Sequence, residues 1–520
     1  MSATRRWIAT HVIELAFAVV LMASIAYWLR ITSESWFFAD EWPMALQVTS
    51  IGNIFEPYNG HLSVVILGLY RGLLEVFGLA TYTPYRLAGA LSLAAVSLAM
   101  FLHARRLVGP GVAAGMGLLL LWFPRLQIEP GGLNHSLALV GGIVCATGLS
   151  GRGHRRDLTV AGGLVLALAS AGGGVAVAAA AVVHSLCTRA SRWRWLAVLL
   201  PSFAWLLWWR LEVPAESGMI VDERPDTLRL VWRALGYAAE SFASLALTNR
   251  AAGVVLLAAF VIHAIWRLRQ GLDAAANVLA WSAALMLWWF GLVRTRWPFL
   301  EEPSFRYELL SAGFILLAVL PRRPAVWAGA RVQDRRRRVG ATVAILGLAV
   351  VLVTAVRPDL QQFASDQAWF GRIVRAQVAT VASERAGVPD DTSYHLGLGY
   401  LDTGQVRSIL RSVTSADVIA RPDQLSLVAA GTRLRILPEA TRPAGCHPLD
   451  ASRAVAPEQG IELHTTLEAS TVEVRRLDEQ WVRIGRVPVG RSAALWLPSV
   501  GLETAWSVRA EGACFVAAGP

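Results

Sequence analysis

The sequence contains no lysine and is poor in charge of either sign. Of its 520 residues 16% are charged and 55% are hydrophobic, and the mean hydropathy is +0.47. A soluble globular chain carries roughly a quarter charged residues, so a wholly soluble protein is excluded. Because arginine supplies the entire basic content and the net charge of +11, the missing lysine indicates the codon usage of a GC-rich bacterium rather than a function.

Cysteine is scarce as well, with four residues. Cys145 and Cys187 lie in apolar segments, where a thiol acts as a small hydrophobic side chain. Cys446 and Cys514 lie near the C-terminus and either form a disulfide in an oxidising compartment or stay free. The sequence also lacks the Cys/His spacing of a zinc site and a Gly-rich phosphate loop after a strand. A nucleotide-sugar enzyme of soluble fold is therefore disfavoured.

Long apolar runs, in contrast, are abundant. A helix needs about 20 apolar residues to cross a bilayer, and such runs recur up to about Val356 and then stop. The first, Val12–Leu29, follows two arginines as a signal peptide would, but we expect it to be retained as a membrane span. We expect further spans at 85–104, 111–123, 134–150, 158–186, 193–210, 251–268, 274–292, 306–321 and 340–356. The segment 158–186 is taken as one odd-numbered crossing, broken at Gly172-Gly173-Gly174.

Arginine placement predicts the orientation of these spans, because Arg-rich loops stay on the cytoplasmic side. The acid-containing loops are expected outside, at 31–84, 124–133, 211–250 and 293–305. The pattern predicts about eleven spans in a bacterial plasma membrane, with a cytoplasmic N-terminus. Arg335–Arg338 could suggest nucleic-acid binding, but its place between two spans favours a topology anchor, and no nucleic-acid partner is expected. The predicted inner loops carry Arg105-Arg106, Arg152–Arg156, Arg189–Arg194, Arg267–Arg269 and Arg322–Arg338.

Two domains follow from this pattern: a transmembrane domain at 1–356 and an extracytoplasmic soluble domain at 357–520. The soluble domain is expected to be helical up to about Ala416. Beyond that, alternation of apolar and polar residues at Thr471–Arg475 and Trp481–Ile484 predicts strands. We therefore expect an α/β or β-sandwich domain that is β-rich from about residue 440.

Two adjacent carboxylates, Asp40 and Glu41, follow the first span within an aromatic stretch that runs from Trp36 to Trp42. They could be ordinary acids of an interfacial loop. They could instead be catalytic, with one carboxylate acting as general base on an acceptor hydroxyl. The neighbouring carboxylate would then orient the acceptor or help to hold a divalent cation, and the sequence leaves the metal open.

The segment Phe38–Trp42 after the first helix resembles the acidic motif in the first external loop of GT-C-class glycosyltransferases. The chain is more similar still to the protein O-mannosyltransferase and aminoarabinose transferase superfamily, through motifs over residues 10–150 and through topology over 150–356. The matching motifs are His61-Leu62, Leu73-Leu74, Phe77-Gly78, Tyr85-Arg86-Leu87 and Ala104–Gly109. The tail is not covered. One departure is Ser170-Ala171-Gly172-Gly173, where the superfamily often has Thr-Lys-Gly-Pro, so a donor contact by that lysine is missing.

The resemblance implies a GT-C-like helical fold and an inverting glycosyltransferase. Its donor would be a polyprenyl-phosphate sugar, and its acceptor a glycan, lipid or protein of the cell envelope. Asp40 would be the catalytic base and Glu41 its partner. Phe305-Arg306-Tyr307 resembles an Arg-Tyr element of related enzymes, in which the guanidinium would hold the lipid phosphate. Alternatively, Arg306 only snorkels to the headgroups.

The remaining candidates lie in the same predicted outer loops or at their edges. Arg71 would contact the donor phosphate or simply pair with Glu75, four residues on, along a helix at His61–Phe77 that lies on the membrane surface. Arg294 and Arg296 are equally open to phosphate binding or snorkelling. His61 would bind the acceptor or a metal, or is a plain interfacial histidine. Glu129 and His135, on either side of Pro130-Gly131-Gly132, would make acceptor or auxiliary contacts of the kind that the superfamily often places in this loop.

Two other functions compete with glycosyl transfer. A flippase or transporter of polyprenyl-linked glycans would need charged residues within its spans and internal repeats. The sequence shows few such charges and no repeat. The other alternative is a non-catalytic membrane protein whose tail binds cell-wall glycan.

Overall fold

The computed structural model describes most of the helical region and, in the last part of the chain, chiefly the strands. The described residues are 11–37, 41–58, 60–79, 81–123, 130–213, 226–296, 305–322, 335–382, 401, 403–412, 433–437, 447–448, 453–455, 461–465, 470–476, 482–487, 492–496, 506–510 and 513–517. The helices are α2 (Val12–Ile31), α3 (Glu41–Gln47), η1 (Gly52–Phe55), α4 (Val64–Phe77), α5 (Thr83–Val108), α6 (Pro110–Leu121), α7 (Pro130–Leu149), α8 (His154–Leu168), α9 (Gly173–Cys187), α10 (Arg192–Glu212), α11 (Thr227–Leu245), α12 (Arg250–Arg269), α13 (Leu272–Arg296), α14 (Phe305–Val319), α15 (Arg335–Ala382) and α16 (Thr403–Ser412).

The chain folds into two compact units. The first, called the helical unit below, comprises Met1–Ser33, Gln47–Val76 and Tyr82–Ser365. The second, called the C-terminal unit, comprises Glu34–Leu46, Phe77–Thr81 and Asp366–Pro520. The segment that carries the acidic-aromatic motif therefore belongs with the C-terminal unit, although it directly follows the first helix. The predicted domain division at residue 356 stays a prediction.

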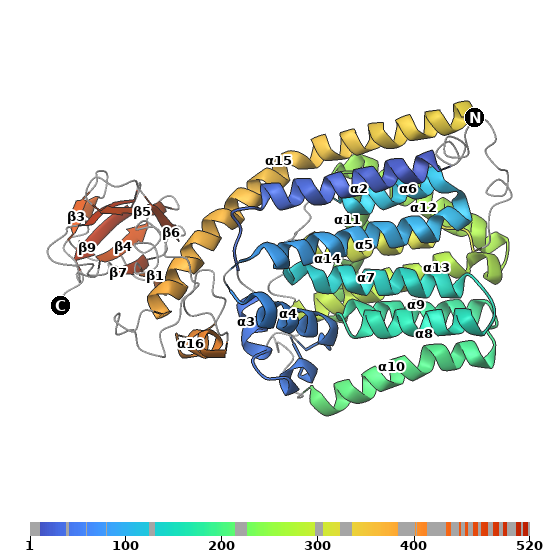
Figure 1. The fold of residues 1–520 in the computed structure, drawn as a ribbon, viewed down its shortest axis with the longest axis horizontal. Coiled ribbons are helices and arrows are strands. Elements are labelled where there is room, and N and C mark those ends of the chain that lie inside the picture. Colours follow the sequence, from blue (N-terminus) through green and yellow to red (C-terminus); the bar gives the residue numbers. More distant parts are fainter. Residues whose placement is uncertain are drawn as a thin grey trace. The chain divides into compact units, whose positions relative to one another are not determined.

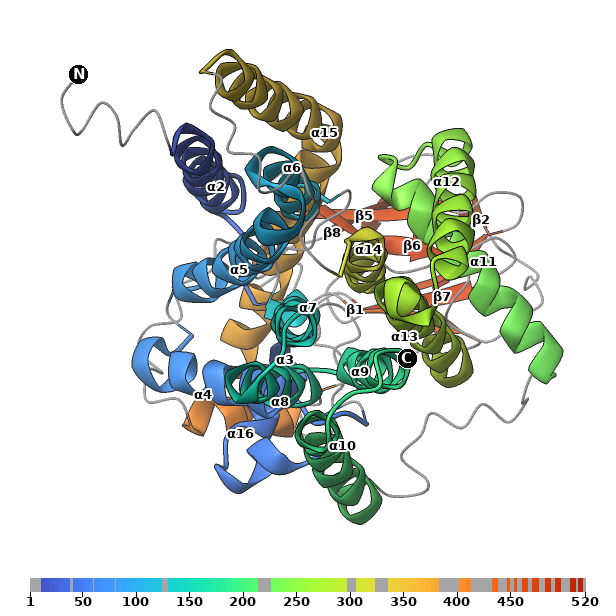
Figure 2. The ribbon, with the colours of Figure 1, turned by 90° about the vertical axis from the view of Figure 1, so that its right-hand side faces the viewer.

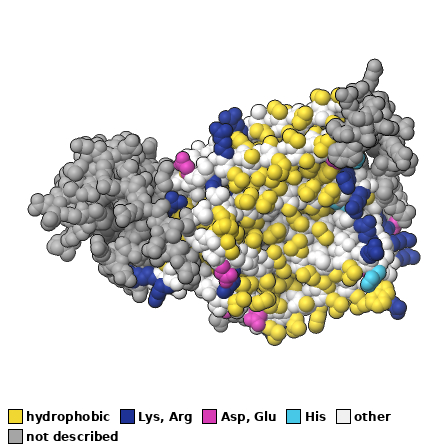
Figure 3. Space-filling view, in the orientation of Figure 1, with side chains coloured by type: hydrophobic (Ala, Val, Ile, Leu, Met, Phe, Trp, Pro, Cys, Tyr) yellow, Lys and Arg dark blue, Asp and Glu magenta, His cyan; other side chains and the backbone are white. Residues whose placement is uncertain are grey.

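The helical unit is that of a multi-pass membrane protein. Among the described residues, six helical stretches are long and apolar enough to cross a bilayer: Val12–Ile31, Thr83–Val108, Gly132–Leu149, Arg250–Arg269, Leu272–Thr295 and Val339–Ser365. Along α12 Gly253 is the one buried residue, and most of the large apolar side chains of this helix are exposed, as on a lipid-facing helix. Figure 3 shows apolar side chains across the described face of the helices, with basic side chains gathered along one edge.

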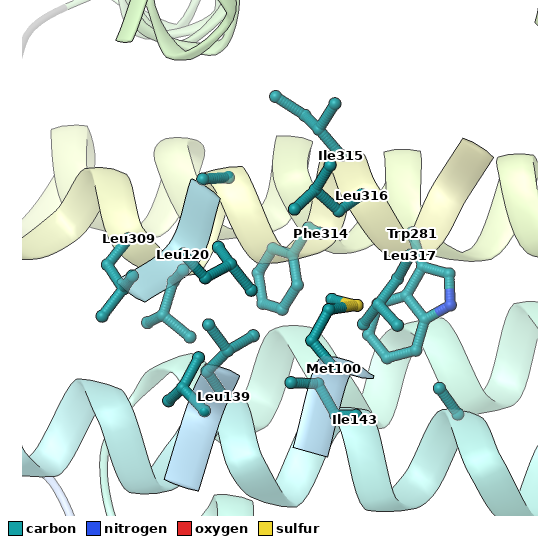
Figure 4. Packing of buried hydrophobic residues seen from close by; sticks show 14 of the residues in the cluster. Met100, Leu120, Leu139, Ile143, Trp281, Leu309, Phe314, Ile315, Leu316 and Leu317 are labelled. Carbon is teal, nitrogen blue, oxygen red and sulfur yellow. The ribbon is translucent and has the colours of Figure 1, made fainter. Parts of the chain in front are cut away.

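Inside the helical unit the helices lie side by side around a continuous apolar core (Figures 1 and 2). Figure 4 shows part of it, with Phe314 of α14 and Trp281 of α13 facing Leu139 and Ile143 of α7. The rings of Trp281 and Phe314 stack with centroids 5.7 Å apart. Lipid tails are as apolar as the helices, so the hydrophobic effect does not drive the helices to associate in a bilayer. Packing of this kind stabilises their association instead.

Helices α7 and α8 approach one another through glycine. A Cβ placed on Gly163 would lie 2.5 Å from the backbone nitrogen of Cys145 and 2.7 Å from the carbonyl oxygen of Gly141. A Cβ on Gly141 would lie 2.6 Å from the nitrogen of Ala167. Real Cβ atoms do not approach backbone so closely, so this contact depends on small residues, as in other membrane helix pairs.

The expected single crossing at 158–186 is wrong, because the structure has two helices there, α8 and α9, joined by a turn at 169–172. In the first turn of α10, Arg194 donates from Nε to Asp157 in the first turn of α8, at 2.5 Å, and from Nη2 to the carbonyl of Gly151. The beginnings of α8 and α10 thus lie at one end of the unit, and α9 runs back between them. The arginine groups 152–156 and 189–194 consequently share an end, as the loop assignment requires.

The predicted outer loop 211–250 contains a helix, α11, that the sequence interpretation missed. Its buried residues recur at helical spacing, as Leu230, Ala234, Tyr237, Ala238 and Ser241. Its other face carries Arg229, Arg233 and Glu240. These charges reduce the mean hydropathy of the segment, so a search for uniformly apolar runs does not find it.

In the C-terminal unit the predicted helical part is present as the end of α15 and as α16, and strands follow. Antiparallel pairs build a five-stranded sheet in the order β1-β7-β4-β9-β2 and a four-stranded sheet in the order β3-β8-β5-β6. The run Thr471–Arg475 lies in β5, as predicted, and β6 begins at Val482 within the second run. The sandwich arrangement stays a prediction, as does the disulfide, since Cys446 is outside the described residues. The strands are β1 (Arg433–Leu437), β2 (His447–Pro448), β3 (Arg453–Val455), β4 (Ile461–Thr465), β5 (Ser470–Arg476), β6 (Val482–Val487), β7 (Ser492–Trp496), β8 (Trp506–Ala510) and β9 (Ala513–Ala517).

Candidate functional site

One end of the helical unit collects several of the residues that the sequence singles out. His103 near the end of α5 contacts Thr147 near the end of α7, with Nδ1 and Oγ1 3.0 Å apart. The beginnings of α5 and α7 therefore lie together at the opposite end, and the turn between α8 and α9 lies there too. This is the end that the arginine pattern predicts to face outward.

The α8–α9 turn is in contact with the segment that precedes α4. A Cβ on Gly172 would lie 2.6 Å from Cε1 of His61, so the imidazole rests directly against the glycine backbone. The backbone nitrogen of Val65 donates to the carbonyl of Ala169 at 3.1 Å. His61 itself pairs with Tyr58 through two backbone hydrogen bonds of 3.0 Å around a turn in which Gly60 has φ +75°. The turn at Tyr58–His61 thus holds His61 against Gly172. Gly172 belongs to the stretch Ser170-Ala171-Gly172-Gly173, in which the sequence departs from the Thr-Lys-Gly-Pro of the superfamily.

On its other side the same turn contacts an aromatic cluster. A Cβ on Gly173 would lie 2.6 Å from Leu310 of α14 and 3.6 Å from Trp288 of α13. The ring of His135 packs edge-on against Trp288 and Tyr307, with centroids 5.7 and 5.5 Å apart. Nε1 of Trp288 donates to the carbonyl of Tyr307 at 3.1 Å. His61 therefore lies against Gly172, while His135 and Tyr307 are connected to Gly173 through Trp288.

Arg86, near the start of α5, holds the end of α2 at this same end of the unit. Its Nη1 donates to the carbonyl of Leu29 at 3.2 Å and also to the carbonyl of Thr32, and its Nη2 donates to Oγ1 of Thr83 at 2.9 Å. The last carbonyls of a helix have no partner within it, and this buried guanidinium satisfies two of them. Arg86 therefore fixes the end of α2 within the helical unit.

Arg71 of α4 has protein partners for its donors. Its Nε is 2.6 Å from Oε1 of Glu75, and its Nη1 donates to the carbonyl of Val48 at 3.1 Å. The pairing with Glu75 at i, i+4 spacing is thus the contact that the structure shows. A phosphate contact by Arg71 stays a prediction.

In the C-terminal unit, Glu41 begins α3 beside three buried aromatic rings. Glu41 is 2% exposed, and the rings of Trp36, Phe37 and Trp42 make edge contacts with one another at 5.3 to 6.2 Å between centroids. Arg375 of α15 places its guanidinium carbon 5.0 Å from the centroid of Trp36. Burial lowers the pKa of Arg375, but an arginine stays charged at physiological pH.

For the other candidate residues from the sequence, the structure describes few or no contacts. Asp40 and Glu129 lie outside the described residues. Arg306 is in the first turn of α14, Arg294 is exposed near the end of α13 and Arg296 ends that helix, but the side chains of Arg306 and Arg296 are not described. Among the residues whose placement is described, no group of three or more His, Cys, Asp or Glu side chains is placed to hold a metal ion.

Comparison with known proteins gives two related structures. No family model matches the chain, and no curated protein matches it. The fold is similar to that of ArnT from Cupriavidus metallidurans bound to undecaprenyl phosphate, with a TM-score of 0.43 and 15% identity, covering 81% of this chain and 92% of that one. It is also similar to an Archaeoglobus fulgidus oligosaccharyltransferase in complex with Zn and sulfate, with a TM-score of 0.35 and 11% identity, covering 69% of this chain and 55% of that one. Because both scores are below 0.5, the residues of this chain carry the functional argument.

In the helical unit, sequence reasoning missed the roles of Arg86, noted only as part of a motif, and of Trp288. In the C-terminal unit it missed Arg375. The sequence did contain a signal for Arg86. An arginine at the start of a predicted span needs a partner, because charge within a membrane is costly without one. Trp288 and Arg375 carry no such signal, because tryptophan is common at membrane interfaces and the chain is rich in arginine.

Replacing Arg86 by Met is expected to lower the free energy of unfolding by about 1.5–3 kcal/mol, since it removes charge-assisted hydrogen bonds to buried carbonyls. Arg86→Lys should recover part of this, because an ammonium retains the charge but not the planar pair of donors. Thermal unfolding in detergent measures both. Arg106→Met, at an exposed position on the same helix, is the control. Equal stability of the two Met variants would contradict a stabilising role of the Arg86 hydrogen bonds to the end of α2.

Proposed function

We propose that this protein is a glycosyltransferase that moves a sugar from a polyprenyl-phosphate donor to an acceptor of the cell envelope at the external face of a bacterial plasma membrane. The observation that carries the proposal is the gathering of His61, His135 and Tyr307 at one end of the helical unit, away from the arginine-rich end. The end of α2, which leads to Asp40 and Glu41, lies at that end as well.

The proposed chemistry is a direct displacement. The acceptor hydroxyl oxygen attacks the anomeric carbon, and Asp40 takes the hydroxyl proton as general base. The bond between the anomeric carbon and the phosphate oxygen breaks, and its electron pair leaves with the polyprenyl phosphate. Arg306 stabilises the negative charge that develops on that phosphate, because its planar donor fork matches two phosphate oxygens. Inversion at the anomeric carbon follows from the single displacement.

The burial of Glu41 supports a functional segment rather than an ordinary interfacial loop. Glutamate is almost never fully buried unless it is paired, and here 2% of the residue is exposed. Electrostatic interactions of a buried carboxylate are stronger than those of a solvated one. We propose that Glu41 orients the acceptor beside Asp40.

The test is transfer by the purified full-length protein in vesicles that contain labelled polyprenyl-phosphate sugars. We expect labelled glycoside to form when an envelope glycan, lipid or protein fraction is supplied. Arg306→Gln is expected to raise KM for the donor about 10- to 100-fold, the value of one or two charge-assisted hydrogen bonds. Arg357→Gln, an exposed position on α15, serves as the control. Movement of lipid-linked sugar across the bilayer without glycoside formation would establish the transporter instead.

A further inference from the structure

We propose that the part of α15 beyond the membrane-spanning stretch, residues 366–382, positions the predicted catalytic segment by holding Trp36. The inference rests on the proposed function, because it names the element that positions the Asp40-Glu41 segment. All the groups it uses belong to the C-terminal unit. Arg375 and Gly371 would be positioning residues, without contact to the substrates.

The contact between α15 and Trp36 is close in two places, one turn apart on the helix. A Cβ on Gly371 would lie 2.9 Å from the backbone nitrogen of Trp36 and 3.1 Å from its Cβ. The guanidinium of Arg375 lies over the Trp36 ring at 5.0 Å, within the range of a cation–π interaction. Positions 371 and 375 are i and i+4, so both face the same side of the helix. Gly371 thus admits the backbone of Trp36 while Arg375 covers its ring.

Trp36 is well placed to transmit this restraint to the carboxylates. Its ring contacts that of Trp42 at 5.8 Å between centroids, and both rings are buried. Trp36 and Trp42 therefore bracket Asp40 and Glu41 in sequence and touch one another in space. Fixing Trp36 against a rigid helix also restrains Trp42 and with it the start of α3, where Glu41 lies. Catalytic carboxylates need such fixed geometry.

The chain provides matched variants for a test. Gly371→Ala brings a methyl group against the Trp36 backbone, whereas Gly347→Ala, on the same helix, meets nothing within 4 Å. Both changes raise helix propensity equally, so a difference between them isolates the contact. Arg375→Met removes the charge over the ring, and Arg375→Lys keeps it. Arg411→Met is the control, because Arg411 is exposed and its Nε donates to the carbonyl of Arg407 in its own helix.

The first measurement needs no activity. Hydrogen–deuterium exchange of the peptide that covers residues 34–46 is expected to become faster in Gly371→Ala and Arg375→Met, with intermediate exchange in Arg375→Lys. Gly347→Ala and Arg411→Met should match the original protein. Unchanged exchange in both Gly371→Ala and Arg375→Met would overturn the proposal, whatever the protein's function.

The second measurement is transfer. Loss of a partly desolvated cation–π contact corresponds to roughly a 5- to 30-fold effect, and we expect it in kcat for Arg375→Met with KM for the donor unchanged, with partial rescue by Arg375→Lys. If the original protein makes no glycoside, the proposed function fails while the exchange result still stands. If it does and Arg375→Met transfers at the same rate, the positioning role is overturned.

Discussion

An Asp40→Asn protein is expected to transfer sugar about 10²–10⁴ times more slowly than the original protein, the usual contribution of a general base. Asparagine is nearly isosteric with aspartate and cannot take the acceptor proton. The loss should therefore fall on kcat, with donor binding unchanged. The measurement is single-turnover transfer from a labelled polyprenyl-phosphate sugar, together with donor binding in the same vesicles.

The control for Asp40→Asn is Glu34→Gln, another acid-to-amide change in the same segment at an exposed position. It should leave kcat within about twofold, since surface substitutions away from a site have small effects. Full transfer by Asp40→Asn would remove Asp40 from the mechanism. Equal losses in the two variants would point to an electrostatic effect of the whole loop rather than to a specific base.

Gly163→Ala is expected to lower the free energy of unfolding of the helical unit by about 1–3 kcal/mol, the usual cost of overpacking. The added methyl group would meet the backbone of α7, at 2.5 Å from Cys145 and 2.7 Å from Gly141. Backbone cannot move aside as a side chain does, so α7 and α8 must separate along their contact.

The neighbouring Gly162 supplies the control for Gly163→Ala. A Cβ at Gly162 meets nothing within 4 Å, so Gly162→Ala should stabilise the helix by about 0.4–1 kcal/mol. Denaturant or thermal unfolding in detergent compares the two, and the sign of the change should differ between adjacent residues. A stabilising Gly163→Ala would show that α7 and α8 do not pack through this glycine.

The sequence predicted most of the helices because a span of apolar residues is a local property. The prediction failed at two places, residues 158–186 and α11, where local hydropathy does not indicate the helices that form. Residues 158–186 are mostly apolar, and Gly172-Gly173-Gly174 indicates a break in the run without showing that the chain turns back there. The turn at 169–172 follows from the Asp157–Arg194 contact and the glycine packing of α8 on α7. Conversely, charges on one face of α11 hid a helix whose other face is buried.

The candidate site likewise combines residues that the sequence identified with an arrangement that it did not predict. Residue chemistry and family resemblance singled out His61, His135 and Tyr307 one by one. Their common position at one end of the helical unit depends on the packing of α7, α9, α13 and α14, which no local pattern encodes. Gly371 and Arg375 carry no local signal, because their role exists only where α15 meets Trp36.

The sequence by itself determined that this is a multi-pass membrane protein, since its apolar content and its distribution admit no soluble alternative. It also predicted two of the strands of the tail and singled out the candidate acids, which are matters of alternation and residue type. Only the tertiary structure showed that 158–186 folds back on itself, that Arg86 donates hydrogen bonds to carbonyls at the end of α2, and that Trp36 lies against α15. These contacts join residues distant in the chain, and only the packing of whole helices brings such residues together.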